Sequence, residues 1–498
     1  MLLPMVSLDR PPVRPATPPA APPALADHLR LPGRPASRAL LAVLAVLAVV
    51  NLAAVAFFLL RLSGHGVGFG PYRIDLDVYR IGGRVWLGHG DLYGVLPPTI
   101  SGVRLPFSYP PIAAVLLSPL SLMPLTAAGT ALTLASIGLT AVVLRVFLRS
   151  AAGSAGALAG SWWTVGWLLP VALFLEPVRN TLDYGQINIL LMALVAADCL
   201  PATVRWPRGA LVGLAAAVKL TPAAFVLFFL CRGDRRAAAT AGVSFAAWTA
   251  AGFLLAWPDS VRYWTSVVFQ TDRPGDPLYA ANQSILAVLA RAGLDPRTPP
   301  GTAAWLALSA IVLVLAWLGM RRALAMSADA WALSLNAFAA LLISPVSWSH
   351  HWVWAGPALL VLAVRGLRGH HRGSVAGVVA GLAVFAAAPQ WWFPFGENRE
   401  AHWAWWQQVL GSSYVILAVL ILLLSAGLFR FRFWRPRALL DTGGEQVHDL
   451  GDARRAHVRP SFGRVDPAEV GPAVELGQRV PERGGPRIGL ERGGDVVG

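Results

Sequence analysis

Lysine is almost absent from this sequence, and charged residues of every kind are few. Lys219 is the only lysine among 41 basic residues in a chain of 498. Charged residues make up 13% of the chain and hydrophobic residues 56%, whereas soluble globular domains carry about 25% charged residues. The scarcity of charge excludes an ordinary soluble protein and favours one built for the lipid bilayer.

Other absences exclude further kinds of site. Cys199 and Cys231 are the only cysteines, and neither has CxxC spacing or a nearby histidine, so no zinc or redox site is indicated. No Rossmann-type glycine loop is present. The net charge of +15 comes from arginines in short loops and in the two terminal segments, as the positive-inside rule describes. No nucleic-acid-binding motif accompanies the charge, and we expect no nucleic-acid partner.

Apolar runs about as long as the bilayer core is thick fill most of the chain. Since about 20 apolar residues span that core, they predict an all-α polytopic membrane protein with about 11–13 transmembrane segments. The shorter runs are expected to be tilted, broken or re-entrant, which requires surrounding protein or a water-filled cavity. The runs lie at roughly 39–61, 109–123, 126–148, 161–178, 186–200, 209–230, 237–257, 302–320, 328–345, 351–366, 373–390 and 413–429.

The two ends of the chain differ in composition from the part between them. Residues 1–38 are rich in Pro, Ala and Arg, and residues 431–498 are rich in Gly, Arg, Asp and Glu. Neither has a core-forming pattern, so both are predicted to be disordered tails, and 39–430 is predicted to be one membrane domain. Arginines beside the first and last runs place both termini in the cytoplasm of a multi-pass plasma-membrane protein.

Three long polar stretches are predicted to lie outside the cytoplasm. Counting crossings from the cytoplasmic N-terminus puts 63–108 outside, and counting back from the C-terminal tail puts 258–301 and 391–412 outside as well. Polar chemistry at the ends of the spans is therefore expected to face away from the cytoplasm.

The middle of the chain allows two arrangements. Twelve simple spans leave four arginines outside, against the positive-inside rule. If 209–230 is instead a broken hairpin with its tip at 219–222, these arginines move inside, and a compensating irregularity is needed between 109 and 148. The four residues are Arg145, Arg149, Arg205 and Arg208.

Two carboxylates, Asp75 and Asp77, lie one residue apart in the polar stretch after the first apolar run, just before Tyr79, and Tyr109 follows in a motif at the end of that stretch. A carboxylate at the end of a span can hold a cation or take a proton from an attacking sugar hydroxyl group. Acidic residues in a solvated loop are equally compatible with simple solvation.

Lys219 lies deep in an apolar run, just before Pro222. Ionisable groups at membrane depth are costly and usually face a cavity or a partner, and an ammonium group there suits a phosphate. The alternative is a side chain that snorkels to the interface at a helix break. His350 and His351, at the junction of two runs, can bind a metal or donate hydrogen bonds to a phosphate, and no third metal ligand of fixed spacing accompanies them.

Four amide side chains occupy the openings of helices at the membrane edge. Such amides suit the binding of sugar hydroxyl groups, and they suit helix capping equally well. They are Gln186, Asn188, Asn282 and Gln283.

Taken in order, these segments resemble glycosyltransferase family 87. The resemblance covers about residues 40–430 and rests on Asp-Leu-x-Val-Tyr at 75–79, Phe-Ser-Tyr-Pro-Pro at 107–111, Gly-Gln-x-Asn at 185–188, Lys-Leu-x-Pro at 219–222, Asn-Gln-Ser at 282–284 and Ser-Pro-Val-Ser-Trp-x-His-His at 344–351. Members of the family include polyprenyl-phosphate-mannose-dependent α-1,2-mannosyltransferases of actinobacteria. The resemblance implies a GT-C-type helical bundle with its active site on the outer face of the membrane.

The resemblance also implies a reaction. A sugar, expected to be mannose, passes with inversion from a polyprenyl-phosphate donor to a cell-envelope glycolipid or polysaccharide. Asp75 is the base, and Lys219 with His350 or His351 stabilises the departing phosphate. A divalent metal is then optional, and no cofactor is predicted. The implied substrate-binding residues are Asp77, Tyr79, Tyr109, Gln186, Asn188, Asn282 and Gln283.

A transporter or flippase of lipid-linked sugars is the alternative of a different class. It should contain paired broken helices in two related halves, and the sequence shows one candidate break, at Lys219. A non-catalytic scaffold would leave the lysine and the histidine pair unexplained.

Overall fold

The computed structural model describes residues 73–152, 160–270, 275–369 and 372–428, with a few positions between 45 and 56. Over these residues every regular element is a helix and no strand forms. The predicted all-α fold is therefore confirmed. The predicted tails, 1–38 and 431–498, and most of the first predicted span lie outside the described residues.

Among the residues that the structure describes, four helical segments are long and apolar enough to cross a bilayer: α4 (Leu125–Ala152), α10 (Arg235–Leu255), α13 (Pro299–Ala325) and Gly373–Trp391. A fifth is present if α17 (Trp405–Gly411) and α18 (Ser413–Ala426), bent by 68° to one another, form one span. These segments confirm a polytopic membrane protein. The total of about 11–13 segments stays a prediction.

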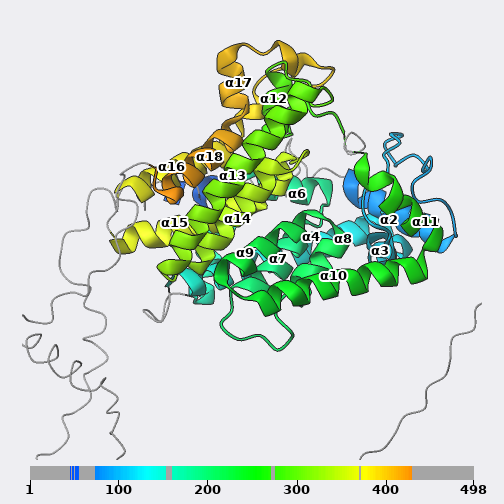
Figure 1. Ribbon diagram of the computed structural model, residues 1–498, viewed down its shortest axis with the longest axis horizontal. Helices are drawn as coiled ribbons and strands as arrows, with labels where there is room; N and C mark the ends of the chain where they lie inside the picture. The colour runs from blue at the N-terminus through cyan, green and yellow to red at the C-terminus, as the bar shows by residue number, and fades with distance from the viewer. Residues whose placement is uncertain are drawn as a thin grey trace, which may run out of the picture. The chain divides into compact units, whose positions relative to one another are not determined.

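Shorter elements complete the described chain. They are α2 (Ile74–Leu87), α3 (Pro111–Leu117), η2 (Ser118–Leu122), α5 (Trp162–Phe174), α6 (Glu176–Tyr184), α7 (Asn188–Cys199), α8 (Ala210–Val218), η3 (Thr221–Phe225), α9 (Val226–Arg232), α11 (Trp257–Thr265), η4 (Val267–Phe269), α12 (Ile285–Arg291), α14 (Asp329–Ile343), η5 (Ser349–Trp354), α15 (Ala355–Gly369), α16 (Arg372–Ala387), η6 (Pro389–Trp391) and η7 (Arg399–His402). Helix α10 packs along α8, α13 packs against α14 and α18, and α15 packs against α16 (Figure 1).

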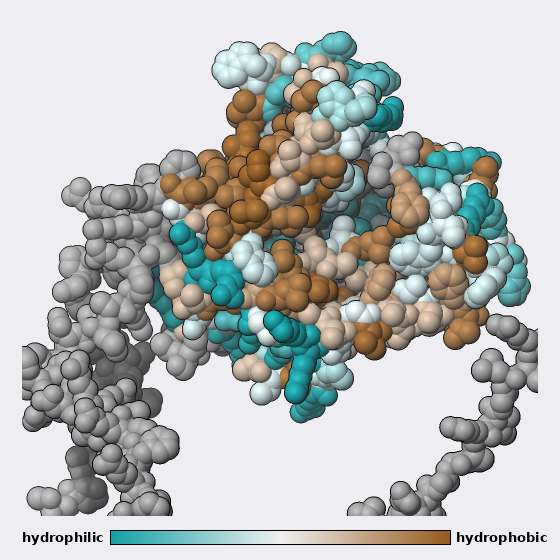
Figure 2. All heavy atoms as spheres, in the orientation of Figure 1, coloured by the Kyte–Doolittle hydropathy of each residue, from teal (hydrophilic) through white to brown (hydrophobic). Residues whose placement is uncertain are grey.

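The outer face of α13 shows what surrounds the protein. Leu306, Ile311 and Val314 on this helix are all more than half exposed. Figure 2 shows apolar side chains gathered over this part of the molecule. In water such a surface would be an aggregation site. In a bilayer the same side chains contact lipid without a free-energy penalty, so we assign this face to the lipid-facing surface of the domain.

The segment between α8 and α9 is a broken hairpin. Helix α8 ends at Val218, Lys219 is extended with φ −149° and ψ 126°, and η3 begins at Thr221. Arg208 before α8 and Arg232 at the end of α9 both donate to the backbone carbonyl of Cys199, at 3.4 and 3.1 Å. Because the two ends of the segment meet at one carbonyl, the chain returns to the side where it entered. The broken-hairpin arrangement is confirmed, and a simple span over 209–230 is not formed.

The compensating irregularity lies in α3 and η2. Together they cover Pro111–Leu122, about 18 Å of helix at 1.5 Å per residue, whereas the hydrocarbon core is about 30 Å thick. They pack against α2, and η2 ends at Leu122 before α4 begins at Leu125. The apolar run at 109–123 is thus a short helical pair beside α2 and not a full span.

The ends of several helices are joined by arginine side chains. Arg321 of α13 donates to the Cys231 carbonyl at 3.2 Å, Arg322 donates to Ala426 at the end of α18, and Arg368 of α15 donates to Ala152 at the end of α4. Arg321 and Arg322, together with Arg208 and Arg232, form what we call the arginine end of the domain. The hairpin enters and leaves here, so its tip points away from this end.

Labelling of introduced cysteines tests the hairpin. Arg205→Cys and Arg236→Cys, at exposed positions flanking the segment, are expected to react with a membrane-impermeant maleimide from the same side of sealed vesicles. Glu397→Cys, in the predicted outer stretch, is the control for the opposite side, and the natural cysteines are buried. Reaction of the two flanking positions from opposite sides would show that 209–230 crosses the membrane.

Candidate active site

Asp75 stands in the first turn of α2, where the helix dipole favours a negative charge. The turn at Gly185 allows this helix to pack closely. Gly185 ends α6 with φ 69°, and a Cβ atom there would lie 2.8 Å from the Cβ atom of Leu76. Only glycine tolerates both the left-handed backbone and the contact. The turn thereby brings Gln186 against the helix that carries Asp75.

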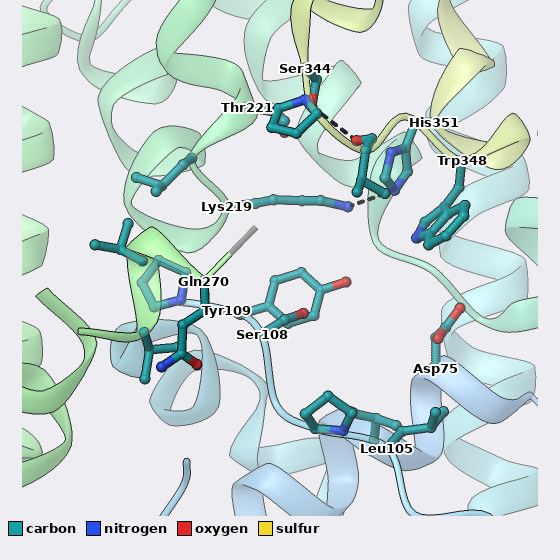
Figure 3. Close-up of a pocket in the computed structure, with 18 of the residues that line it drawn as sticks. Asp75, Leu105, Ser108, Tyr109, Lys219, Thr221, Gln270, Ser344, Trp348 and His351 are labelled. Carbon is teal, nitrogen blue, oxygen red and sulfur yellow. Dashed lines mark hydrogen bonds between the residues drawn. The ribbon is translucent and has the colours of Figure 1, made fainter. Parts of the chain in front are cut away.

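A cavity of about 300 Å³, called the first cavity below, gathers side chains from segments far apart in the chain. The walls come from α2, the 105–110 segment, the hairpin tip, the α11–η4 region and the 344–351 segment. Figure 3 shows Asp75 and the Lys219–His351 pair facing this space. The cavity brings together six residues expected from the sequence: Asp75, Tyr79, Tyr109, Gln186, Lys219 and His351.

The Lys219 ammonium group is held by two hydrogen-bonding partners. It donates to Asn188 Oδ1 at 3.1 Å and lies 3.2 Å from His351 Nε2. The Tyr109 ring centroid is 5.4 Å away, within cation–π range. To accept from the ammonium group, the imidazole must be neutral with its proton on Nδ1. An ammonium group has three donors, so one remains to bind an anion in the cavity.

The Asp75 carboxyl group is tuned by its surroundings. Burial raises its pKa to about 6, while a hydrogen bond from Gln186 and the positive charge of Lys219 act in the opposite direction. The Gln186 Oε1 atom accepts from the hydroxyl group of Tyr79 at 2.7 Å and, more weakly, from that of Tyr109 at 3.4 Å. With its oxygen occupied in this way, the amide presents its nitrogen to Asp75. The carboxylate is thus ionised at neutral pH and still basic enough to accept a proton.

A carboxylate opposite an ammonium–imidazole pair suits a transfer reaction with an anionic leaving group, and sequence comparisons support this chemistry. The profile of glycosyltransferase family 87 matches residues 107–345. The polyprenol-phosphate-mannose-dependent alpha-(1-2)-phosphatidylinositol mannoside mannosyltransferase of Mycobacterium tuberculosis is 42% identical over 401 residues, 78% of this chain and 91% of the relative. The chain belongs to glycosyltransferase family 87.

Two further relatives of this family 87 protein carry similar names. The protein of the same name from Mycolicibacterium smegmatis is 41% identical over 74% of this chain and 85% of the relative. A phosphatidylinositol pentamannoside mannosyltransferase of Mycobacterium tuberculosis is 35% identical over 60% of this chain and 68% of the relative. No solved structure matches the chain. These relatives support sugar transfer and give no support to the transporter alternative.

The two histidines of this glycosyltransferase face different spaces. His351 lines the first cavity beside Lys219, whereas His350 lines a neighbouring one. The His350 ring lies between His351 and Tyr184, with centroids 4.8 and 5.2 Å away. Its backbone carbonyl accepts from the side chain of Asn188 at 2.9 Å. The sequence leaves open which of the two histidines acts with Lys219. In the structure His351 is the partner of Lys219.

Four residues expected to bind substrate line neither cavity: Asn188, which accepts from Lys219, and three that bond to other parts of the protein. Asp77 is buried, pairs with Arg80 at 3.4 Å and accepts from the Ile100 amide at 3.0 Å. The Asn282 side chain accepts from the Ser347 amide at 3.0 Å, and Gln283 donates to the Gly411 carbonyl at 2.7 Å. All three satisfy protein groups and hold segments in place, so we leave them out of the proposed substrate contacts.

Some residues of the first cavity were not found by sequence reasoning. Tyr263 and Gln270 line it from α11 and the segment after η4. Both belong to the predicted outer stretch 258–301, which was the only signal available, because neither residue stands in a motif. Trp348, within the Ser-Pro-Val-Ser-Trp motif, also lines the cavity without having been assigned a role.

No metal centre is formed by the part of the chain that the structure describes. Within it, no group of three or more His, Cys, Asp or Glu side chains is arranged to hold a metal ion. The positive charge available in the first cavity is the ammonium group of Lys219. That no metal is needed stays a prediction.

Replacement of Asn282 tests its structural assignment. Asn282→Ala is expected to destabilise the protein by about 1–3 kcal/mol, since it leaves the Ser347 amide of this buried segment without its partner and removes one of the two side-chain donors to the Pro345 carbonyl. Thermal unfolding in detergent measures the loss. A variant of unchanged stability with a raised KM for a substrate would place Asn282 in the binding site instead.

Proposed function

We propose that the chain transfers mannose from polyprenyl-phosphate mannose to a hydroxyl group of a phosphatidylinositol mannoside, with inversion to an α-1,2 linkage. The observation that carries this proposal is the meeting of Asp75 with the Lys219–His351 pair in one cavity. Asp75 accepts a proton, and the Lys219 ammonium group, held by His351, binds a phosphate. The names of the relatives supply the donor and the class of acceptor.

The reaction begins with the donor phosphate against Lys219. Asp75 takes the proton of the acceptor hydroxyl group as its oxygen forms a bond to C1 of the mannose. The bond between C1 and the phosphate oxygen breaks, and its electron pair leaves on polyprenyl phosphate. The products are the lengthened glycolipid, polyprenyl phosphate and a proton on Asp75, which passes to water.

The ammonium group of Lys219 offsets the charge that grows on the departing phosphate. Such preorganised electrostatic stabilisation is often the largest single contribution to catalysis. His351 orients this group, and Asn188 Oδ1 accepts a second hydrogen bond from it at 3.1 Å. Because the cationic group is already in place, little reorganisation accompanies the step.

The direction of the hairpin supports an active site on the extracytoplasmic side. Lys219 lies at the tip, and the arginine end lies at the other end of the hairpin. Under the positive-inside rule the arginine end faces the cytoplasm. The first cavity then opens away from it, and lipid-linked donor and lipid acceptor both reach it from the bilayer.

Replacement of the base tests this function directly. In proteoliposomes supplied with polyprenyl-phosphate mannose and a phosphatidylinositol mannoside, Asp75→Asn is expected to lower kcat about 100-fold or more, the contribution of a general base. Thermal stability should hold, since the side chain keeps its shape. Asp77→Asn is the matched control. It should lower thermal stability, because it removes the negative charge that pairs with Arg80. Equal rates for wild type and Asp75→Asn would overturn the proposed base.

The pKa of Asp75 predicts the pH dependence. Since the carboxyl group must be ionised to accept a proton, kcat/KM should fall as the pH drops through about 6. Gln186→Leu removes a hydrogen bond that lowers this pKa, so the inflection should move to higher pH. Gln270→Leu, in the same cavity, is the control and should leave it in place. A profile flat through this range would exclude Asp75 as the titrating group.

A further inference from the structure

A second cavity, of about 310 Å³, lies beside the first and has no role in donor binding as described above. Asp75 and Trp348 line both cavities, so the carboxylate stands in the wall between them. Figure 3 shows these two residues on the same side of the first cavity. The remaining walls of the second come from the end of α6, η5 and the segments 275–281 and 396–400.

The second cavity differs from the first in charge. Four acidic residues line it, and no lysine or arginine is among the described residues that do so; the four are Asp75, Asp276, Glu397 and Glu400. Glu397 is paired with Arg399 at 2.9 Å, outside the lining. A phosphate here would meet carboxylates without a cationic partner, which costs free energy at short range. The lining therefore favours an uncharged ligand.

Aromatic rings and polar groups alternate around this space. Tyr184, Tyr279 and Trp348 line it, and the rings of Tyr279 and Trp348 stand edge to face with centroids 5.9 Å apart. Ligand sites typically combine such rings with a few placed polar groups that fix orientation. A sugar ring, with apolar C–H faces and hydroxyl groups at its rim, matches this combination.

The imidazole of His350 lines this cavity and lacks a hydrogen-bond partner in the protein. Its side chain is 6% exposed, and neither ring nitrogen has a hydrogen-bond partner in the protein. A buried polar group left in this state is unfavourable until a ligand or water completes it. A neutral imidazole offers one donor and one acceptor, which suits sugar hydroxyl groups because each of them both donates and accepts.

We propose that the second cavity binds the acceptor through an uncharged, polyhydroxylated sugar head group, with His350 hydrogen-bonded to one of its hydroxyl groups. The proposal rests on the transferase function above. It assigns His351 to the site of the donor and His350 to the site of the acceptor. The attacking hydroxyl group reaches Asp75 from the second cavity while C1 of the donor approaches from the first. Attack thus comes from the side opposite the phosphate, as inversion requires.

The histidine pair provides a matched test in the full-length protein. His350→Phe keeps the ring and removes both nitrogens, and it should raise the KM for the phosphatidylinositol mannoside about tenfold, the effect of one neutral hydrogen bond. Its KM for polyprenyl-phosphate mannose should change less than about twofold. His351→Phe should affect the donor more than the acceptor. An unchanged acceptor KM in His350→Phe, or an equal rise for both substrates, would overturn the assignment.

A second experiment needs neither a buried substitution nor turnover. Asp276→Cys is placed at an exposed position of the second cavity and is modified with a bulky maleimide after folding, while Cys199 and Cys231 stay buried. In phosphatidylcholine nanodiscs, a phosphatidylinositol mannoside should raise the unfolding temperature of the unmodified protein and not that of the modified one. Asp295→Cys, also exposed and with the same turn-type hydrogen bond, is the control.

The outcomes separate the two proposals. A shift that survives modification at position 276, or no shift even without modification, would overturn the acceptor site whatever the enzyme transfers. A shift abolished by modification, in a protein that transfers no mannose to the lipid, would support the site and overturn the proposed function.

Discussion

The burial of one ammonium group is the constraint around which the polar centre of this protein is arranged. A cation at membrane depth is tolerated when protein groups or a cavity compensate it. Lys219 finds compensation in Asn188, His351 and the Tyr109 ring, and its charge acts on Asp75. These residues belong to separate segments of the chain. Satisfying one charge therefore fixes the relative positions of the elements that form the first cavity.

The ammonium group of Lys219 stands where regular helix is interrupted between α8 and η3, in an apolar part of the chain. Irregular backbone survives there only if its polar groups find partners. At the entry to the hairpin the buried Asp198 carboxylate accepts from the amides of Gly209, Leu211 and Val212, which satisfies donors that a helix N-terminus leaves open. Pro222 stands in the first turn of η3, where its missing N–H is not needed. The break is thus a supported structure that presents a side chain to the cavity.

The sequence predicted the elements and the polar groups better than it predicted their partners. The all-α membrane fold, the family and the hairpin alternative followed from apolar runs, ordered motifs and arginine positions, because each of these is a local property of the chain. Asp75, Lys219 and one of the two histidines were predicted to act together, and one cavity holds Asp75, Lys219 and His351.

The sequence does not predict the role of a side chain when that role depends on its hydrogen-bonding partners in the folded protein. Asn282 and Gln283 look like sugar-binding amides in the sequence, but they bond backbone groups of Ser347 and Gly411. The different surroundings of His350 and His351 follow from the irregular turn of η5, which residue spacing does not encode.

The solitary lysine has a practical consequence too. Because Lys219 is the sole lysine of the chain and lines the first cavity, its acylation by an amine-directed reagent would serve as a chemical footprint of that cavity, read by mass spectrometry without any engineered label.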